Sequence, residues 1–412
     1  MYRRLLSNTR FAKLLAGQSI STFGSAVTQI ALPTVAVLVL HVTPLELGIL
    51  IALQRIPFPI LALFVGVWVD RLPRRRVMIA SDILRAIVLA AVPISASAGV
   101  LSLPLLYGVA LLSGVLQIFF DLSYLSYVPE LVERDRLSDA NSTLQLSQSV
   151  ASLAGPGLGG LLIQALGAAR AISVDAASFV VSFLSLLWMG GDTRRPDPRV
   201  SAGMRRELAE GFAHVFAHPV LRTMIVIFGL VILCGHMIEP NLYPFAYSNL
   251  HLTPAVLGWL LSAEGAAAVV GAYLTPRLTS RYTAGWILAM TGAISGLAFI
   301  VLSFAAAGPV ILIVLASLLV NGLNDPANNV TQWSLRQLLT PDHLQGRMNA
   351  IFRTVYWGAW PLGNLVGGYL GTVAGPRTSI FLAGLLFGSL SLLFLVGPTR
   401  RARLVSPAEV KI

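Results

Sequence analysis

Long runs of apolar residues, separated by short polar connections, divide this chain. A helix that crosses a lipid bilayer needs about 20 mostly apolar residues. Runs of that length occur twelve times, at residues 11–40, 45–69, 77–98, 101–127, 138–168, 170–190, 220–248, 254–276, 283–306, 308–334, 346–374 and 377–397. The hydrophobic pattern therefore predicts an all-α integral membrane protein with twelve transmembrane helices.

Basic residues are concentrated in alternate connections between these runs. One set of connections contains Arg3, Arg4, Arg10, Lys13, Arg71, Arg74, Arg75, Arg76, Arg134, Arg136, Arg194, Arg195, Arg199, Arg205, Arg206, Arg277, Arg281, Arg336, Arg347 and the basic tail from Arg400 to Lys411. The other set contains only Arg170 and Arg377. Because Lys and Arg are enriched in cytoplasmic loops, this bias predicts that both termini are cytoplasmic.

The longest connection, residues 191–219, falls at the middle of the chain. It opens with GDTRRPDPRV, where proline and charge favour irregular structure. Apolar residues then recur at helical spacing and predict an amphipathic surface helix, namely at Met204, Leu208, Phe212, Val215 and Phe216. The predicted domains are an N-terminal six-helix bundle (1–190), a cytoplasmic linker with this helix (191–219), a C-terminal six-helix bundle (220–398) and a cytoplasmic tail (399–412).

The two halves of the chain resemble each other in sequence. Residues 131–170 and 338–377 align at a constant offset of 207, which pairs Leu131 with Leu338, Asp135 with Asp342, Gly160 with Gly367 and Arg170 with Arg377. Several matches at about half the chain length indicate the duplication of a six-helix unit. Two such units in the same orientation are related by a pseudo-two-fold axis along the membrane normal, and substrates bind between them.

Composition agrees with a lipid environment and excludes several kinds of chemistry. Hydrophobic residues make up 56% of the 412 residues and charged residues 11%, whereas a soluble domain has about 25% charged residues. The net charge of +11 lies in short loops, so we expect no nucleic-acid partner. The six histidines are scattered, Cys234 is the single cysteine, and no phosphate-binding GxxxxGKS/T loop occurs. We therefore expect no catalytic site, metal or cofactor.

The connection between the second and third runs carries the most specific motif, GVWVDRLPRRRVMIASDILRA at residues 66–86. Its glycine is expected to pack closely on a neighbouring helix, and opposite charges in so short a turn can lock helices together on the cytoplasmic side. The motif resembles the signature loop of the major facilitator superfamily, in which Gly, Asp-Arg and a later basic pair recur. This chain departs from the family at Pro73, where Gly is frequent.

This resemblance implies a cytoplasmic gate. Because an acidic residue of the fourth helix can pair with the loop in the superfamily, the gate is expected to contain Gly66, Asp70, Arg71, Arg74, Arg75 and Asp121. The corresponding loop of the second half, LTPRLTSRY at residues 274–282, keeps two arginines but has no aspartate. The lock is therefore expected to be asymmetric.

A second motif, ASLAGPGLGG at residues 151–160, lies in the fifth run. Ala151, Gly155 and Gly159 form a face of small residues that another helix can approach closely. Pro156 removes a helical hydrogen bond and favours a kink. The segment, which ends at Gly160, resembles the fifth-helix motif of superfamily exporters that work as antiporters, and this implies outward transport.

Further segments, FFDLSYLSYVPELVERDRLSDAN (119–141) and AISVDAASFVVSF (171–183), look like the drug-exporting branch that includes macrolide and siderophore exporters. The resemblance implies a monomer in the cell (inner) membrane that exports drug, antibiotic or siderophore-like amphipathic molecules by alternating access and proton antiport. Its partners are then a small-molecule substrate, protons and the lipid bilayer. An importer or facilitator on the same fold, a non-transporting receptor and a membrane enzyme are the alternatives.

Ionisable residues inside the runs are functional candidates because charge is costly in a membrane. Proton antiport needs a carboxyl group that changes protonation as access alternates. Glu264 lies near the middle of the eighth run and is the first candidate, followed by Glu239 in the seventh and Asp325 in the tenth. A buried ion pair with Arg55 or Arg353 is the alternative for each carboxyl group.

Residues of the substrate cavity are predicted from polar and aromatic positions in helices that form the cavity of this fold. They are Gln29, Arg55, Asn241, Tyr243, Arg353 and Trp357. Packing is the alternative for the aromatic residues. Asp82 and Arg85 are three residues apart in the third run and are expected to pair locally.

Overall fold

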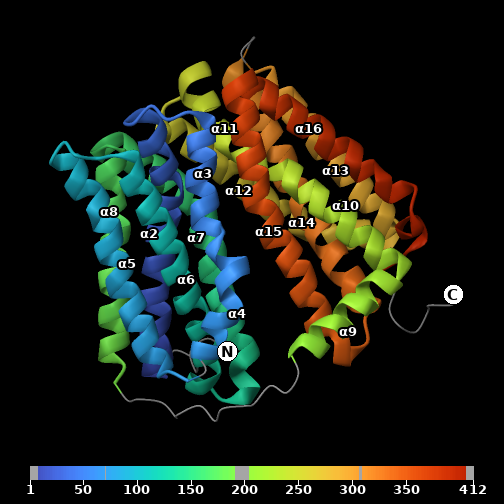
Figure 1. The fold of residues 1–412 in the computed structure, drawn as a ribbon, viewed down its shortest axis with the longest axis horizontal. Helices are drawn as coiled ribbons and strands as arrows, with labels where there is room; N and C mark the ends of the chain where they lie inside the picture. The colour runs from blue at the N-terminus through green and yellow to red at the C-terminus, as the bar shows by residue number, and fades with distance from the viewer. Residues whose placement is uncertain (1–7, 70, 191–203, 306–308, 405–412) are drawn as a thin grey trace. The chain divides into compact units, whose positions relative to one another are not determined.

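The computed structural model of the chain describes residues 8–69, 71–190, 204–305 and 309–404, and every regular element in these ranges is helical (Figure 1). The first half contains α2 (Thr9–Leu38), α3 (Pro44–Arg55), α4 (Pro57–Val69), α5 (Arg74–Ser97), α6 (Leu103–Leu131), η1 (Arg134–Arg136), α7 (Leu137–Leu166) and α8 (Ala168–Trp188). The second half contains α9 (Met204–Ala217), α10 (Pro219–His236), α11 (Glu239–Pro244), the π-helix η2 (Phe245–Asn249), α12 (Pro254–Arg281), α13 (Ala284–Ser303), α14 (Val310–Leu338), α15 (Asp342–Ala374), α16 (Pro376–Leu392), η3 (Leu393–Leu395) and η4 (Pro398–Arg401).

Eleven helical segments among the described residues are long and apolar enough to cross a membrane. The twelfth long helix, α15, has 33 residues. Its sequence carries Arg347, Arg353 and Asn364 among its apolar residues. These segments correspond to the twelve predicted runs and confirm an all-α membrane fold.

Two of the predicted spans are divided into more than one helix. The run 45–69 breaks at Ile56, between α3 and α4, and Pro57 begins the second of these helices. The run 220–248 divides into α10, α11 and η2 beside Pro240 and Pro244. Proline lacks the N–H that continues a helical ladder, which accounts for breaks at these points. The breaks place Arg55 and Glu239, two candidate site residues, at helix ends.

The first of two compact units contains the described residues up to Val42, residues 53–190 and Leu252–Ser262. In this unit α2, α5 and α8 lie side by side (Figure 1), since α8 packs against both α2 and α5. Helix α6 packs on α5, and α7 packs on α2. The apolar core between the helices includes Phe11, Leu14, Met78, Tyr127 and Leu186.

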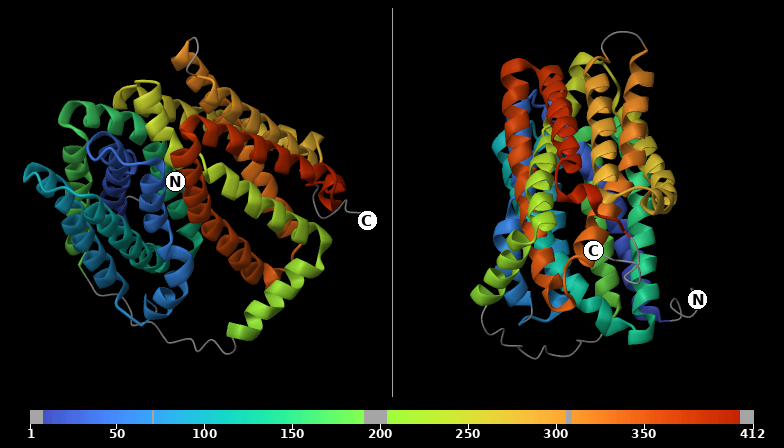
Figure 2. Two further views of the ribbon diagram at one scale, coloured as in Figure 1. Left: turned by 45° about the horizontal axis from the view of Figure 1, so that its top comes forward. Right: turned by 90° about the vertical axis from the view of Figure 1, so that its right-hand side faces the viewer.

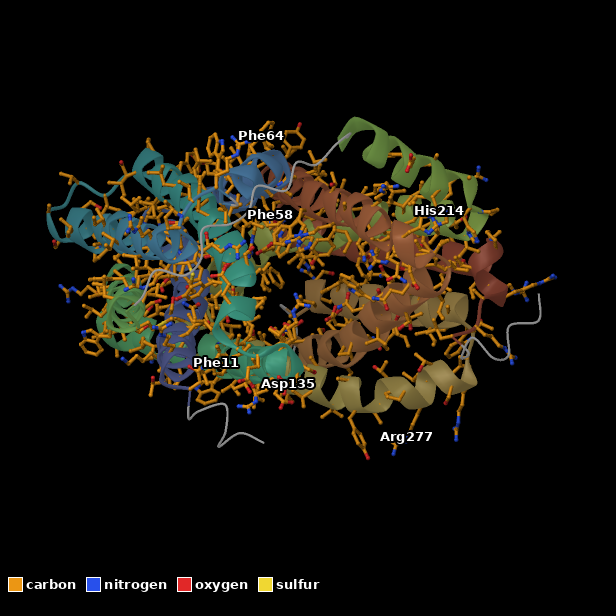
Figure 3. The ribbon with its side chains drawn as sticks, turned by 90° about the horizontal axis from the view of Figure 1, so that it is seen from below. Phe11, Phe58, Phe64, Asp135, His214 and Arg277 are labelled. Carbon is orange, nitrogen blue, oxygen red and sulfur yellow. The ribbon has the colours of Figure 1, made fainter. Side chains whose placement is uncertain are left out.

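The second unit contains Thr43–Ala52 and the described residues from 204 to 251 and from 263 onward. Helix α13 packs against α14 and α16, and α10 packs against α15 and α16. The core includes Met224, Phe228, Leu288, Met348 and Phe352. Arg277 of α12 is exposed, and its side chain points away from the helices (Figure 3).

The predicted surface helix is present as α9, which lies beside α10 and α15 (Figure 2). Val215 is buried, whereas Phe212 and Phe216 are exposed and stack on each other with ring centroids 6.1 Å apart. Glu210 forms an ion pair with Arg347 of α15. The side chains of residues 204–209, including two of the predicted apolar positions, lie outside the described part. The helix is therefore anchored to α15 through Glu210, and its two phenylalanines are exposed.

The sequence repeat appears again in the backbone. His41 and His251, which are 210 residues apart, have φ of 51° and 52°. Gly167 and Gly375, which are 208 residues apart, have φ of 85° and 86°. Left-handed residues thus recur at equivalent turns of the two halves, as expected for a duplicated unit.

A close glycine contact also occurs in each unit. In the first unit, a Cβ atom on Gly160 would lie 3.1 Å from the Cα atoms of Ala255 and Gly258. In the second unit, a Cβ atom on Gly368 would lie 3.0 Å from Cα of Leu45. Backbone atoms cannot yield as a flexible side chain does, so these glycines permit the helices to approach closely.

Candidate functional site

Two arginines of the predicted gate connect helices of the first unit. Arg74, the first residue of α5, forms an ion pair with Glu130 of α6, and its Nη1 donates a hydrogen bond to the carbonyl of Ser126 at 2.8 Å. Arg75 donates from Nε to the carbonyl of Leu186 at 2.8 Å, near the C-terminal end of α8. Positive charge is favourable at a helix C-terminus. The start of α5 is therefore tied to the ends of α6 and α8.

The other predicted gate residues have different surroundings. Asp70 lies outside the described residues, and Arg71 is exposed. Asp121 accepts a hydrogen bond from Gln117 Nε2 at 2.6 Å on its own helix. No described atom of another helix lies within 4 Å of a Cβ built on Gly66, so the close packing expected there is not found. The acidic partner that the structure shows for Arg74 is Glu130, a residue the motif did not identify.

The small residues of α7 face α2 on one side. Ala151 has no exposed surface, and Gly155 adjoins the side chain of Ala26. A Cβ atom on Gly159 would lie 3.3 Å from Cα of Val27. These residues form the face of small side chains expected from the sequence, and the helix that approaches it is α2.

The opposite side of α7 contacts the start of α12. The backbone N–H of Gly157 donates a hydrogen bond to Ser262 Oγ at 2.8 Å. Gly160 packs on Gly258, and the carbonyl oxygen of Pro156 faces Gly258 as well. Helix α7 is thus held at close range on two faces, and a shift of α7 must move α2 or α12 with it.

Glu239, the first residue of α11, lies among aromatic rings of the second unit. Its Oε2 accepts a hydrogen bond from Trp360 Nε1 at 2.8 Å and lies 3.5 Å from Nδ1 of His236. The His236 ring stacks on Trp360 with centroids 4.0 Å apart, and Trp360 stacks on Trp357 at 5.6 Å. We call Glu239, His236, Tyr356, Trp357 and Trp360 the Glu239 cluster. It joins a carboxyl group and an imidazole, two groups that can each bind and release a proton.

The other two candidate carboxyl groups lie on neighbouring helices of the second unit. Gly322 of α14 adjoins the backbone carbonyl of Glu264 in α12. A Cβ atom on Gly271 would lie 3.1 Å from Cα of Leu323, so α12 and α14 are in close contact. Glu264 is half-buried and interacts electrostatically with Asp325, which is exposed. The structure therefore brings these two candidates together and keeps Glu239 in a separate cluster.

The six predicted cavity residues have different degrees of burial. Gln29 and Arg353 are exposed. Arg55 and Trp357 are half-buried, and Asn241 and Tyr243 are buried. Trp357 belongs to the Glu239 cluster, and Tyr243 interacts electrostatically with Glu239. The common cavity expected for these residues remains a prediction.

Asn241 has clear packing contacts in the second unit. Its Nδ2 donates hydrogen bonds to the carbonyls of Met237 and Gly367, each at 2.8 Å, and to Ser379 Oγ at 3.0 Å. The side chain has no exposed surface. These bonds connect α11 to α15 and α16 and support a role in holding the helices together.

The sequence matches the family model of the Major Facilitator Superfamily over residues 14–360 and, in an overlapping match, 232–411. It is 32% identical over 392 residues to the multidrug efflux pump Tap of Mycolicibacterium fortuitum, an alignment that covers 90% of each chain. It is also 26% identical over 346 residues to the enterobactin exporter EntS of Salmonella paratyphi A, which covers 84% of this chain and 82% of that protein.

Solved structures of transporters share the fold. The nucleoside transporter NupG superposes with a TM-score of 0.73 at 14% identity over 94% of this chain and 98% of that chain. A bacterial homolog of the human lysosomal transporter Spinster, in an inward-facing and unoccupied conformation, gives a TM-score of 0.74 at 13% identity over 97% and 99%. At these identities the likeness concerns the fold.

Proposed function

Since this chain belongs to the Major Facilitator Superfamily, and is therefore a multi-pass membrane transporter of small molecules, we propose that it exports amphipathic molecules in exchange for protons. The observation that carries the direction of transport is the 32% identity to a multidrug efflux pump across 90% of both chains. The similarity to an enterobactin exporter supports the same direction. The proposed substrates are drug, antibiotic or siderophore-like compounds.

The proposed location is the bacterial inner membrane, with both termini in the cytoplasm and the monomer as the working unit. The concentration of basic residues in alternate connections supports this orientation. It places Arg74, Arg75 and Glu130 at the cytoplasmic ends of their helices. Their contacts tie α5, α6 and α8 of the first unit together at that end, where we place the cytoplasmic gate.

The two-sided packing of α7 supports a role in alternating access. Gly155 and Gly159 hold α7 against α2, and Gly160 holds it against α12. Pro156 weakens the helical ladder close to these contacts. A bend at Pro156 could therefore change one contact while the other is kept, which is the kind of motion that antiport requires.

Among the three candidate carboxyl groups, Glu239 has the geometry that best fits proton exchange. An N–H donor stabilises an ionised carboxyl group, whereas loss of water stabilises the protonated form. Trp360 supplies the donor, and Glu239 itself is partly exposed, with 33% of its side chain accessible. A movement of α15 relative to α11 would alter both effects. Glu264 and Asp325 are the alternative proton carriers.

The proposal is tested with inverted membrane vesicles from cells that produce the chain. Respiration acidifies the lumen of such vesicles, so an exporter driven by protons accumulates a drug or siderophore-like substrate inside. We expect accumulation that a protonophore abolishes, a strong loss in Glu239→Gln, and normal accumulation in Asp135→Asn, an exposed control (Figure 3). Uptake into right-side-out vesicles instead would identify an importer and contradict the proposal.

A further inference from the structure

A group of buried charged residues in the first unit has no part in the proposed function. Helix α5 buries a stripe of residues at helical spacing, which includes Met78, Asp82, Arg85 and Leu89. Asp82 has no exposed surface, and Arg85 is 8% exposed. Asp175 of α8, the helix that packs on this stripe, is 2% exposed. The charges are therefore enclosed by protein on several sides and do not lie on a lipid-facing surface.

The guanidinium of Arg85 lies near two aromatic rings. Its Cζ lies 3.8 Å from the ring centroid of Phe179 and 5.9 Å from that of Phe120. A guanidinium over a ring face is stabilised by the ring electrons. Arg85 also interacts electrostatically with three carboxyl groups, those of Asp82, Asp121 and Asp175. One positive charge therefore interacts with three acidic side chains.

Asp175 has hydroxyl donors of its own. Ser178 Oγ donates to Asp175 Oδ1 at 3.1 Å, and Ser25 Oγ of α2 donates to the same atom at 3.4 Å. Gly24 permits this approach, since a Cβ atom there would lie 2.7 Å from Asp175 Oδ1. Hydrogen bonds to a carboxylate favour its ionised form. Asp175 is buried like Asp82, and it differs from Asp82 in having these donors, which support a negative charge opposite Arg85.

Asp82 differs from Asp175 in its surroundings. Both of its carboxyl oxygens are buried, and neither has a hydrogen-bond partner among the described residues. Ser182 faces Asp82 but does not meet the geometry of a hydrogen bond, and its Oγ accepts a bond from Gln18 Nε2 at 3.1 Å. An ionised carboxyl group in such a place is far more costly than a neutral one.

We propose that Asp82 is a proton-binding site of the first unit, occupied in the conformation described, which releases its proton when Arg85 moves from Phe179 toward it. The O–H bond of the carboxyl group then breaks, the proton passes to solvent, and the carboxylate pairs with the guanidinium. The charged groups that interact with Asp82 are Arg85 on its own helix and Asp175 on α8, and Arg85 in turn interacts with Asp121 on α6. This site is additional to the three carboxyl groups considered for antiport.

Infrared spectroscopy tests the proposal, because a protonated carboxyl group has its own C=O stretching band. The full chain is purified into lipid nanodiscs, and spectra are compared for the unmodified protein, Asp82→Asn and the exposed control Asp135→Asn. We expect one protonated-carboxyl band to be absent from Asp82→Asn and present in the other two proteins. A band unchanged in Asp82→Asn, or no such band in the unmodified chain, would overturn the proposal.

A second measurement does not depend on the folding of a variant. Unmodified protein labelled with ¹³C at the aspartate side-chain carboxyl carbon should show the same band at lower frequency. An unshifted band would assign the proton to a glutamate and overturn the proposal. The unfolding temperature gives a further criterion. Asp82→Asn replaces a neutral group by a neutral group, so its unfolding temperature should be close to that of the unmodified chain. The unfolding temperature of Asp175→Asn should be lower. Neither measurement involves transport, so a failure of the proposed antiport would leave this result unaffected.

Discussion

The indole N–H of Trp360 donates a hydrogen bond to Oε2 of Glu239 at 2.8 Å, and so joins α15 to the first residue of α11. Trp360 also stacks on His236, whose Nδ1 lies 3.5 Å from the same carboxyl oxygen. A movement of α15 therefore changes the surroundings of a carboxyl group and an imidazole together. This coupling is the physical basis for assigning proton exchange to the Glu239 cluster.

Trp360→Phe is expected to destabilise the chain by about 1.5 kcal/mol, the lower end for hydrogen bonds to charged groups, because Glu239 is partly exposed. The substitution keeps an aromatic ring beside His236 and removes only the N–H donor. Thermal unfolding in detergent measures the loss. Trp188→Phe, at a side chain that is 71% exposed, is the matched control and should be neutral. Equal losses in the two variants would show that the hydrogen bond contributes nothing.

The ion pair between Arg74 and Glu130 should have a measurable coupling energy. Their side chains are 18% and 22% exposed, so the pair is better shielded than an exposed pair, whose coupling is about 0–1 kcal/mol. A double-mutant cycle with Arg74→Ala and Glu130→Ala should give at least about 1 kcal/mol. The pair of Arg136 and Glu133, with side chains 39% and 74% exposed, is the control and should couple more weakly. A stronger coupling between Arg136 and Glu133 than between Arg74 and Glu130 would contradict a gate at Arg74.

Gly160→Ala and Gly368→Ala should each destabilise the chain by about 1–3 kcal/mol, the usual cost of overpacking. The added methyl carbon would lie 3.1 Å from the Cα atoms of Ala255 and Gly258 in the first variant and 3.0 Å from Cα of Leu45 in the second. Gly108→Ala is the control, because no described atom lies within 4 Å of its Cβ position. There the change should stabilise α6 by about 0.5–1 kcal/mol, since glycine is unfavourable inside a helix. If all three substitutions changed the stability in the same direction, the result would argue against the close contacts.

The junction between α9 and α10 should weaken at acidic pH. Burial lowers the pKa of His218 below its usual value of 6.5, and the neighbouring His214 lowers it further. The folded chain thus binds this proton less readily than the unfolded chain. The contribution of His218 to the free energy of unfolding is therefore complete when the pH is above the pKa of this histidine in the unfolded chain. It falls as the pH drops through that pKa.

Thermal unfolding measured between about pH 8 and pH 5 checks this prediction. His218→Gln should reduce the loss of stability on acidification. His343→Gln changes an exposed histidine of α15 and should leave the pH dependence unchanged. If His218→Gln unfolds with the same pH dependence as the unmodified chain, the titration of His218 has no part in the junction.

The apolar runs predict the helices well because length and hydrophobicity are local properties of the sequence. They do not reveal the breaks at Ile56 and before Glu239, since proline can also be accommodated inside a membrane helix. The sequence alignment of the two halves pairs Gly160 with Gly367. The contacts instead make Gly368 the equivalent of Gly160, one residue further along.

The candidate site is harder to predict because its contacts join residues far apart in the chain. Arg74 and Glu130 are on different helices, and no periodicity in the sequence marks such a pair. The spacing of Asp82 and Arg85 predicts a local pair; the two side chains do interact electrostatically, but Arg85 stacks on Phe179 of α8. Depth in the membrane ranked Glu264 above Glu239, but it could not show that Trp360 and His236 face Glu239. Such side-chain neighbourhoods depend on helix packing.

Proton-driven export is tested most directly with the purified chain in proteoliposomes under an imposed pH gradient, with a pH-sensitive dye inside and no other energy source. The account predicts that a drug or siderophore-like substrate moves against its concentration gradient while protons move in the opposite direction, and that Glu239→Gln loses both movements together. Substrate accumulation that continues after the pH gradient has been abolished, with no counter-movement of protons, would contradict it.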